Sequence, residues 1–399
     1  MFSTYYGELL ISPLPIELSG NFCSHMCGYC FANLNQPNRK YDVLKTMRFL
    51  KEFKTRRSLT AKLLKNGYPV LYSNKIDPFS ASNFMHSLPL IELMVQMNIK
   101  ISIQTRGGHG IDEVLKILPK SVFYISITCS NLAIEQKIEP GAPPLPQRLA
   151  LIDKLIKLGH YVVVGINPAV PEWMPDPLPL LVELKKLGVW GVWIERLHLN
   201  YKQIRNMTDK ERANISEPIL TRARKRYTHP KDFNHYKRVK YMANTIGLET
   251  FSVGQPDYSN FFYPYRVCYK NTFPIFQDFI NLLHINKYDK HTPIFFNDLW
   301  EFMGHKFPKG EFKLHHYLGA TSRDLFKKID IPLNMSYQKL LKIIWKQPKT
   351  KYSLVKSPAF AYMSHYSHTK NKLIQLVDDE KLPILAYSKI GFKSYYTPF

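Results

Sequence analysis

Three cysteines lie close together near the start of the sequence. They occupy the segment Cys23-Ser-His-Met-Cys27-Gly-Tyr-Cys30, with spacings of three and then two residues. Thiolates bind iron tightly, and three of them leave one iron of a four-iron cubane cluster without a protein ligand. The spacing therefore predicts one tight loop that holds a [4Fe–4S] cluster through Cys23, Cys27 and Cys30, with the fourth iron open to a chelating molecule.

Zinc is the alternative metal for such a loop. A zinc site needs a fourth ligand, for which His25 is the nearest candidate, and it usually shows paired C-x2-C motifs. The chain has only two other cysteines, Cys129 and Cys268, and both lie far along the sequence. The cysteine pattern argues against a disulfide framework and favours a metal or redox site in a reducing, cytoplasmic setting.

Short apolar segments alternate with helical patterns through the first half of the chain. This alternation predicts βαβ units and a parallel sheet. Six units are too few for the usual eight-stranded closed barrel, so we expect an open, partial (β/α)6 barrel of the α/β class. The expected strands are Glu8–Pro13, Tyr68–Ser73, Ile99–Gln104, Val122–Thr128, Tyr161–Ile166 and Val189–Glu195, and the expected helices are Tyr41–Lys65, Ser82–Met97, Ile111–Leu118, Pro146–Leu158 and Leu178–Leu187.

Polar residues follow most of these strands. In barrels of this kind the chemistry lies at the carboxyl ends of the strands, so these residues are candidates for a site around the cysteine loop. They are Ser73, Asn74 and Asp77 after the second strand, Arg106 after the third, Cys129 after the fourth, Asn167 after the fifth, and Glu195, Arg196 and His198 after the sixth.

The cysteine segment, with the aromatic Tyr29 before its last cysteine, resembles the signature of the radical S-adenosylmethionine superfamily. Within that superfamily the chain is similar to the spore photoproduct lyase-related branch over about residues 5–200. The similarity rests on Cys23–Asn33, on Asn74–Ser80, and on Glu139–Arg148 followed by Asn167-Pro-Ala-Val-Pro171. It implies a [4Fe–4S] cluster and S-adenosyl-L-methionine as cofactors, a 5′-deoxyadenosyl radical as the reactive product, and an electron donor of the flavodoxin or ferredoxin type.

The resemblance also implies roles for single residues. Tyr29 would pack near the adenine, and Asn167 would reach the ribose or adenine. Ser73, Asn74 and Asp77 are candidates for the methionyl amino group, with a simple Asp-Pro turn as the alternative for the last. Arg106 would pair with the methionyl carboxylate, unless it is a solvated surface arginine. Glu139 and Arg148 would contact the cofactor or form an ion pair that fixes their loop.

Cys129 has two interpretations. A thiol beside a radical site can donate a hydrogen atom to a product radical, which would make Cys129 catalytic. A lone cysteine is otherwise a small buried hydrophobic residue. The photoproduct lyases carry such a cysteine near the second strand, where this chain has Ser73 and Asn74, so photoproduct reversal itself is in doubt.

The chain has a strong excess of positive charge, which is +24 over 399 residues. Residues 1–200 hold 22 Lys and Arg against 15 Asp and Glu, and residues 201–399 hold 33 against 16. Such a bias favours a polyanionic partner, of which nucleic acid is the commonest, although a lysine-rich surface that serves solubility is the alternative. A basic, helical stretch is expected over Asp209–Ile246, and the aromatic segment Tyr258–Tyr265 follows it.

These features predict a barrel over residues 1–205, a basic helical and aromatic connecting region over 206–270, and a C-terminal accessory domain over 271–399. Together they form a barrel with a basic, aromatic-rich C-terminal extension. No apolar run is long enough to span a membrane, and no secretory signal is expected. We expect a radical enzyme that modifies or repairs nucleic acid or a nucleotide. The alternatives are a radical enzyme acting on a small molecule or peptide, and a zinc-stabilised nucleic-acid-binding protein.

Overall fold

A computed structural model gives the structure of this chain. It describes residues 14–16, 23–30, 43–56, 61, 64–65, 67, 69–72, 76–197, 199, 201–225, 229–251, 263–269, 293–304, 338, 342, 345, 366–369, 372–375, 377–382 and 384. Most of the predicted C-terminal extension lies outside these residues, as do Ser73, Asn74 and His198.

The described part of the chain contains a parallel sheet of seven strands whose spatial order follows the sequence order. Each strand pairs in parallel with the next, and no pairing of described residues joins the first strand to the last. The strands are β1 (Leu14–Ile16), β2 (Val70–Tyr72), β3 (Ile101–Thr105), β4 (Val122–Ser126), β5 (Tyr161–Ile166), β6 (Gly191–Ile194) and β7 (Thr250–Phe251).

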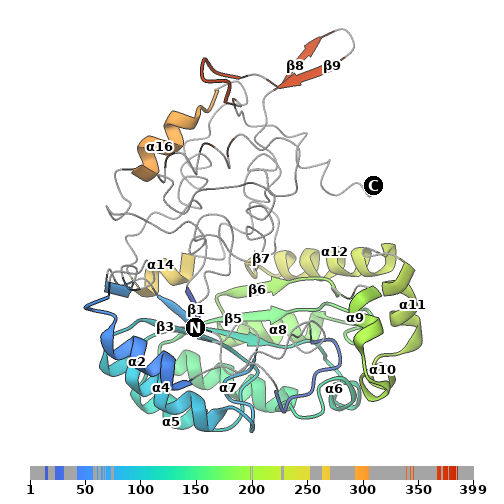
Figure 1. The fold of residues 1–399 in the computed structure, drawn as a ribbon. Coiled ribbons are helices and arrows are strands. Elements are labelled where there is room, and N and C mark those ends of the chain that lie inside the picture. Colours follow the sequence, from blue (N-terminus) through green and yellow to red (C-terminus); the bar gives the residue numbers. More distant parts are fainter. Residues whose placement is uncertain are drawn as a thin grey trace.

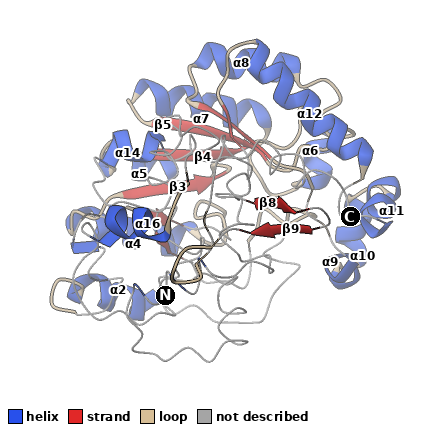
Figure 2. Cartoon of the chain, turned by 90° about the horizontal axis from the view of Figure 1, so that it is seen from above, coloured by secondary structure: helices blue, strands red, loops and turns tan. Residues whose placement is uncertain are grey.

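Helices follow one another around the outside of this curved sheet (Figure 2). All strands point toward one edge, beside which α6 and α9 to α11 lie (Figure 1). The helices around the sheet are α2 (Val43–Glu52), α4 (Phe84–Gln96), α5 (Ile111–Ile117), α6 (Leu132–Ile138), α7 (Leu145–Lys157), α8 (Leu178–Leu187), α9 (Tyr201–Asn206), α10 (Asp209–Asn214), α11 (Glu217–Lys225) and α12 (Pro230–Thr245), and further along the chain come α14 (Tyr263–Tyr269), α16 (Phe296–Gly304) and the antiparallel hairpin of β8 (Tyr366–Thr369) and β9 (Lys372–Gln375).

The core lies between the sheet and its outer helices. The described residues of β2 and β4 are buried throughout, as expected for parallel strands that are covered on both faces. Helix α7 packs Leu151, Ile152 and Leu155 into this core. Gly159, just past its end, has a left-handed backbone that terminates the helix, as the sequence predicted.

The long basic stretch expected as one helical region is divided into α10, α11 and α12. Pro218 and Pro230 lie at the beginnings of α11 and α12. Proline is tolerated in the first turn but would break a helix interior, because it lacks an N–H and clashes with the preceding turn. The two prolines therefore explain why the stretch is not one continuous helix.

Helix α14 closes the sheet at the end opposite to the one where the strands point. The Tyr269 hydroxyl donates to the carbonyl of Ile101 (2.6 Å) and accepts from the N–H of Val122 (2.9 Å), at the starts of β3 and β4. Tyr265 packs beside Tyr269 in the same cluster. Tyr265, the last residue of the aromatic segment noted in the sequence, has its side chain buried in the core.

The predicted parallel α/β fold, an open partial barrel, is confirmed. A seventh strand, β7, adds to the six predicted and extends the sheet past residue 205. The expected first strand, Glu8–Pro13, lies outside the described residues, and the described strand β1 begins at Leu14. Within the described residues, no helix has the length and apolar character that crossing a membrane requires.

Candidate functional site

The cysteine loop follows β1, at the edge toward which the strands point. Two turns shape it: the N–H of Met26 donates to the carbonyl of Cys23 (3.1 Å), and the N–H of Cys30 donates to that of Cys27 (3.1 Å). Met26 reverses the chain with a left-handed backbone (φ 52°), which is uncommon for a residue other than glycine. Cys23 and Cys27 are buried and Cys30 is partly exposed.

Neighbouring loops hold the cysteine loop from two sides. Ser24 and Ser82 bond reciprocally, each donating its N–H to the other's hydroxyl (3.1 and 3.2 Å). On the other side, Gly141 donates its N–H to the carbonyl of His25 (3.1 Å), while the ring Nδ1 of His25 lies 2.9 Å from the carbonyl of Gly141. These backbone contacts leave the loop little freedom to change shape.

Gly141 lies so close to the cysteine loop that no side chain fits there. A Cβ atom on Gly141 would lie 1.9 Å from the carbonyl oxygen of Ser24. We expect Gly141→Ala to cost at least the roughly 1–3 kcal/mol typical of overpacking, and to displace the loop. Urea unfolding gives the cost, and faster modification of Cys23 and Cys27 by a thiol reagent reports the displacement.

Gly159→Ala is the matched control. A Cβ atom at Gly159 meets nothing within 4 Å, although its left-handed backbone (φ 82°) still makes alanine cost about 1–2 kcal/mol. Thiol reactivity should therefore stay at the wild-type rate in this variant. Equal thiol reactivity in Gly141→Ala and wild type would show that Gly141 does not fix the loop.

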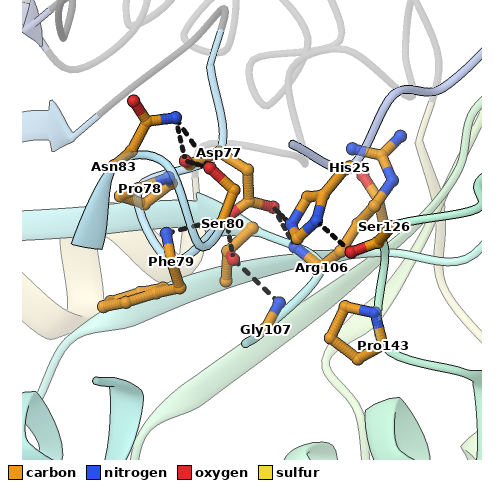
Figure 3. A network of polar contacts seen from close by, with 12 residues as sticks. His25, Asp77, Pro78, Phe79, Ser80, Asn83, Arg106, Gly107, Ser126 and Pro143 are labelled. Carbon is orange, nitrogen blue, oxygen red and sulfur yellow. Dashed lines mark hydrogen bonds and ion pairs between the residues drawn. The ribbon is translucent and has the colours of Figure 1, made fainter. Parts of the chain in front are cut away.

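Asp77 joins the cysteine loop to β3, as Figure 3 shows. Its Oδ1 accepts from the Thr105 hydroxyl (2.6 Å) and the Phe79 N–H (3.0 Å), and its Oδ2 accepts from the Arg106 N–H (2.6 Å). Nε2 of His25 lies 3.2 Å from Oδ2, an ion-pair distance, although its direction does not suit a hydrogen bond. Burial opposes ionisation, but His25, Thr105 and the Arg106 N–H lower the pKa of Asp77 overall.

Glu139 is the centre of a second buried network. Its Oε1 accepts from Tyr29, from Thr128 (2.8 Å) and from Nε of Arg106 (3.1 Å), and its Oε2 accepts from Arg148 (2.5 Å). Burial alone would raise the pKa of Glu139, but Arg148 and then Arg106 hold it well below its usual range. The ion pair between Glu139 and Arg148, one of the two roles predicted for them, is therefore present.

Arg106 connects this network to the thiols. Nη2 donates to the Tyr29 hydroxyl (2.9 Å) and Nε to Glu139, so Nη1 alone of the side-chain nitrogens has no hydrogen bond with a described residue. The side chain is 18% exposed. A carboxylate could therefore bind Nη1, whereas bidentate pairing would require Arg106 to release Tyr29 or Glu139.

The thiols lie within electrostatic range of one another. Burial is the main cause that raises the pKa of Cys27; Glu139, Cys30 and Cys23 add to it, and Arg106 opposes it. Burial and Asp77 raise the pKa of Cys23, against hydrogen bonds from the backbone of His25 and Asp77 and from Ser80. A cationic group bound by the sulfurs would relieve this mutual repulsion and favour the thiolates.

A single metal ion requires several donor side chains that converge on one point. Among the described residues, no three His, Cys, Asp or Glu side chains are grouped as ligands of one ion. Three thiols on one loop suit a cluster in donor type, because the ligands of a cubane bind separate irons. The cysteine loop therefore fits an iron–sulfur group in the chemistry of its three thiol donors.

Cys129 and Tyr29 belong to one hydrophobic cluster with Cys27 and Trp173. Sγ of Cys129 is fully buried and donates to the carbonyls of Trp173 (3.0 Å) or Asn131 (3.2 Å). Burial is the main cause that raises its pKa to about 11. The Tyr29 ring packs on Trp173, with 5.3 Å between centroids. Trp173 was not predicted as a site residue, because the sequence around a tryptophan in a loop does not indicate which ring it packs against.

Three further predicted residues follow the last strands of the site, and one of them, Glu195, is buried directly after β6. Asn167 follows β5; burial raises the pKa of the Tyr124 hydroxyl, and the Asn167 side chain acts in the opposite direction. Arg196 follows β6 and lies over the ring of Phe233, 5.5 Å from its centroid. The structure thus brings Cys23, Cys27, Cys30, Tyr29, Asp77, Arg106 and Glu139 into one connected network, with Cys129 in the adjoining cluster.

A pocket of about 640 Å³ lies on the outer side of the cysteine loop. It is lined by His25, by residues 106–109 after β3, by residues 140–143, and by Gln147 and Lys154 of α7. It opens widely to solvent, so the loop is close to the surface on this side.

No protein-family model matches the chain. An uncharacterized protein, ORF301 of Acidianus two-tailed virus, is 27% identical over 194 residues, which cover 44% of this chain and 64% of that protein. The chain thus matches less than two thirds of the length of this relative.

Several solved structures have a similar arrangement. One is Streptococcus suis SuiB bound to S-adenosylmethionine (TM-score 0.41, 12% identity, covering 63% of this chain and 54% of SuiB). Another is spore photoproduct lyase complexed with dinucleoside spore photoproduct (TM-score 0.46, 15% identity, 63% and 78%). A third is methylornithine synthase, PylB (TM-score 0.35, 15% identity, 61% and 72%). Scores this low do not identify what this chain does.

Proposed function

We propose that this chain is a radical S-adenosylmethionine enzyme with one [4Fe–4S] cluster held by Cys23, Cys27 and Cys30. The observation that carries the proposal is the cysteine loop itself. Its three thiols lie at the edge toward which the strands of a parallel sheet point, and contacts with two neighbouring loops fix its backbone. When bound and reduced, such a cluster supplies the electron that cleaves S-adenosylmethionine to a 5′-deoxyadenosyl radical.

The residues around the loop divide into two roles in this proposal. Asp77 and Glu139 position other groups, because their carboxylate oxygens already accept bonds from protein donors. Arg106 would hold a methionyl carboxylate through Nη1, while Glu139 and Tyr29 keep its other nitrogens in place. These two contacts hold the Arg106 guanidinium in electrostatic range of Cys27 before any cofactor binds.

The environment of Cys129 suits a packing role better than the role of a hydrogen-atom donor. Its thiol is fully buried and directed to backbone carbonyls, so donation would require the side chain to rotate away from the carbonyl of Trp173. We keep the donor role as a proposal only for a state in which this contact has broken.

Nucleic acid is the substrate class that we propose. The support is the net charge of +24 and its concentration in residues 201–399. The alternative is a small molecule or peptide substrate, which predicts weak nucleic-acid binding with little dependence on salt.

Anaerobic reconstitution with iron and sulfide tests this proposal. Expected are bound iron and inorganic sulfide, and release of 5′-deoxyadenosine from S-adenosylmethionine with a reductant or a flavodoxin-type donor. Stimulation by DNA or RNA would support the substrate class, and stimulation by neither would favour the alternative. Zinc without iron or sulfide in oxygen-free protein would overturn the proposal of a radical enzyme. It would support the alternative of a zinc-stabilised nucleic-acid-binding protein.

A further inference from the structure

Helices α8 and α12 lie next to each other on the outside of the barrel, with contacts between them. Arg238 of α12 donates to the carbonyl of Pro175 just before α8 (3.2 Å), and Lys185 near the end of α8 donates to the carbonyl of Gly247 just after α12 (2.5 Å). The two helices therefore run in the same direction and form one continuous outer surface.

Exposed cations lie along this surface. They are Lys185 and Lys186 of α8 and Lys237 and Arg238 of α12, and with Tyr241 we call them the α8–α12 basic face. None of the four cations forms an ion pair with a described residue: Arg238 contacts a backbone carbonyl, and Lys237 lies over the ring of Phe233, 4.2 Å from its centroid. Their charge is therefore available to a partner.

Several other basic side chains of the described helices are neutralised by carboxylates, in contrast to the four cations of this face. Arg222 of α11 is buried and makes a two-pronged contact with Glu172 (2.9 and 2.8 Å) and an ion pair with Asp232 (3.0 Å). On α7, Lys154 pairs with Asp112 (2.7 Å) and Lys157 with Asp153 (2.5 Å). A basic sequence stretch has thus been divided into cations that hold the fold together and cations that face solvent.

Arg238 of this face also acts electrostatically on a buried side chain of α12. His235 is buried on the inner side of the helix, and burial is the main cause that lowers its pKa. Arg238 and Lys231 lower it further, while Glu172 and Asp232 act in the opposite direction.

Tyr241 is the most exposed large aromatic residue beside these cations, with 72% of its surface accessible. It lies three residues beyond Arg238, on the same side of α12. An exposed ring flanked by Lys and Arg can stack on an unpaired base while the cations contact the adjacent phosphates.

The beginning of α12 is tied to the cysteine-loop site. Lys231 donates to Glu172 (2.6 Å), and the next residue, Trp173, packs against the ring of Tyr29. A nucleic-acid strand that lies along α12 and continues past the N-terminus of this helix therefore approaches the edge of the barrel toward which the β-strands point (Figure 1). The cysteine loop lies at this edge.

We infer that the α8–α12 basic face binds single-stranded nucleic acid, with Lys185, Lys186, Lys237 and Arg238 on phosphates and Tyr241 stacked on a base. The inference rests on the proposed function in taking nucleic acid as the substrate class. It adds the surface that holds the polymer and its single-stranded form.

Fluorescence anisotropy with a short labelled oligonucleotide, as oligo-dT and as oligo-U, tests the surface on the full chain between about 50 and 200 mM salt. Each phosphate contact on a single strand adds about 0.7 to the salt dependence, so Lys237→Gln with Arg238→Gln should reduce the slope by about 1.4. Tyr241→Ala should weaken binding roughly fivefold to a hundredfold, because it removes one stacked base.

Lys157→Gln with Arg56→Gln is the matched control, since it removes the same charge from one exposed lysine and one exposed arginine that are already paired. It should leave the affinity and the salt slope close to those of the wild type. Equal weakening by both double variants would overturn the inference, because only total charge would then matter. A duplex bound as tightly as the single strand, with no effect of Tyr241→Ala, would contradict the stacked base.

Failure of this inference is distinguishable from failure of the proposed function. Binding needs no cluster, so it can be measured on metal-free protein. No binding of either oligonucleotide would overturn the basic face even if iron, sulfide and 5′-deoxyadenosine were all found. Binding with the expected variant effects would support the face even if the metal were zinc.

Discussion

Replacing Glu139 with alanine is expected to destabilise the fold by about 3–5 kcal/mol, the usual cost of leaving a buried charge without its partner. The Glu139 and Arg148 side chains are both 0% exposed. The variant would remove the carboxylate that both Arg148 and Arg106 contact, with Glu135 as the remaining carboxylate near Arg148 (3.3 Å). Urea unfolding of metal-free protein measures the loss. Glu113→Ala on the exposed side of α5 is the control, and it should change stability by less than about 0.5 kcal/mol.

Acid supplies a second test of the same network. The pKa of Glu139 is held below its usual range, so its contribution to stability is complete above about pH 4.3, the ordinary pKa of a glutamate, and is lost as the pH falls toward the folded-state pKa. The stability gap between wild type and Glu139→Ala should therefore narrow below about pH 4. A gap that stays constant in acid, or that is below 1 kcal/mol at neutral pH, would contradict the role given to Glu139.

Cys27→Ala is expected to abolish cluster assembly and, with it, cleavage of S-adenosylmethionine. Cys27 is the middle one of the three proposed ligands; it is buried, and Arg106 acts on its pKa electrostatically. Two thiolates would remain for a cluster that needs three protein ligands, and neither is placed to substitute for the third. Iron and sulfide per chain, with the visible absorbance of oxygen-free protein, give the result.

Cys268→Ala is the control for this experiment, because Cys268 lies near Lys120, donating to its carbonyl (3.3 Å), far from the cysteine loop. It should retain wild-type iron and sulfide. Full iron and sulfide in Cys27→Ala would show that the three-cysteine assignment is wrong, whatever the activity of the wild type.

Local sequence pattern was sufficient for the barrel elements whose ends have a local cause. The ends of β5 and α8 were predicted to the residue, because apolar runs of the right length stop at Asn167 and Gly188. Helix α6 was missed: it is short, and its main signal is the side chain of Asn131, which caps it by accepting from the N–H of Ala133 (2.9 Å) and of Ile134 (3.3 Å). Strand β7 was missed because two residues carry no readable period.

The site shows a similar division. The cysteine spacing indicated a metal loop directly, and the position of Asp77, Arg106 and Glu139 after strands or in a framed loop marked them as candidates. The hydrogen-bond partners of these residues could not be predicted from the sequence. Glu139 and its partner Tyr29 are 110 residues apart in the chain, and His25 and its partner Gly141 are 116 residues apart. Long-range contacts of this kind depend on which strands become neighbours, and no spacing in the sequence encodes that.

The contacts of Tyr269 determine where the chain can be truncated without loss of part of the barrel. Its hydroxyl bridges the beginnings of β3 and β4, and it comes from a helix that follows β7 in the chain. A fragment ending near residue 205 would lack both Tyr269 and β7. The end of its barrel where the strands begin would be uncovered, and the outer edge of β6 would have no pairing strand. Residues 1–205 therefore do not complete the barrel by themselves, because Tyr269 and β7, which come later in the chain, cover its opposite end and pair with its last strand.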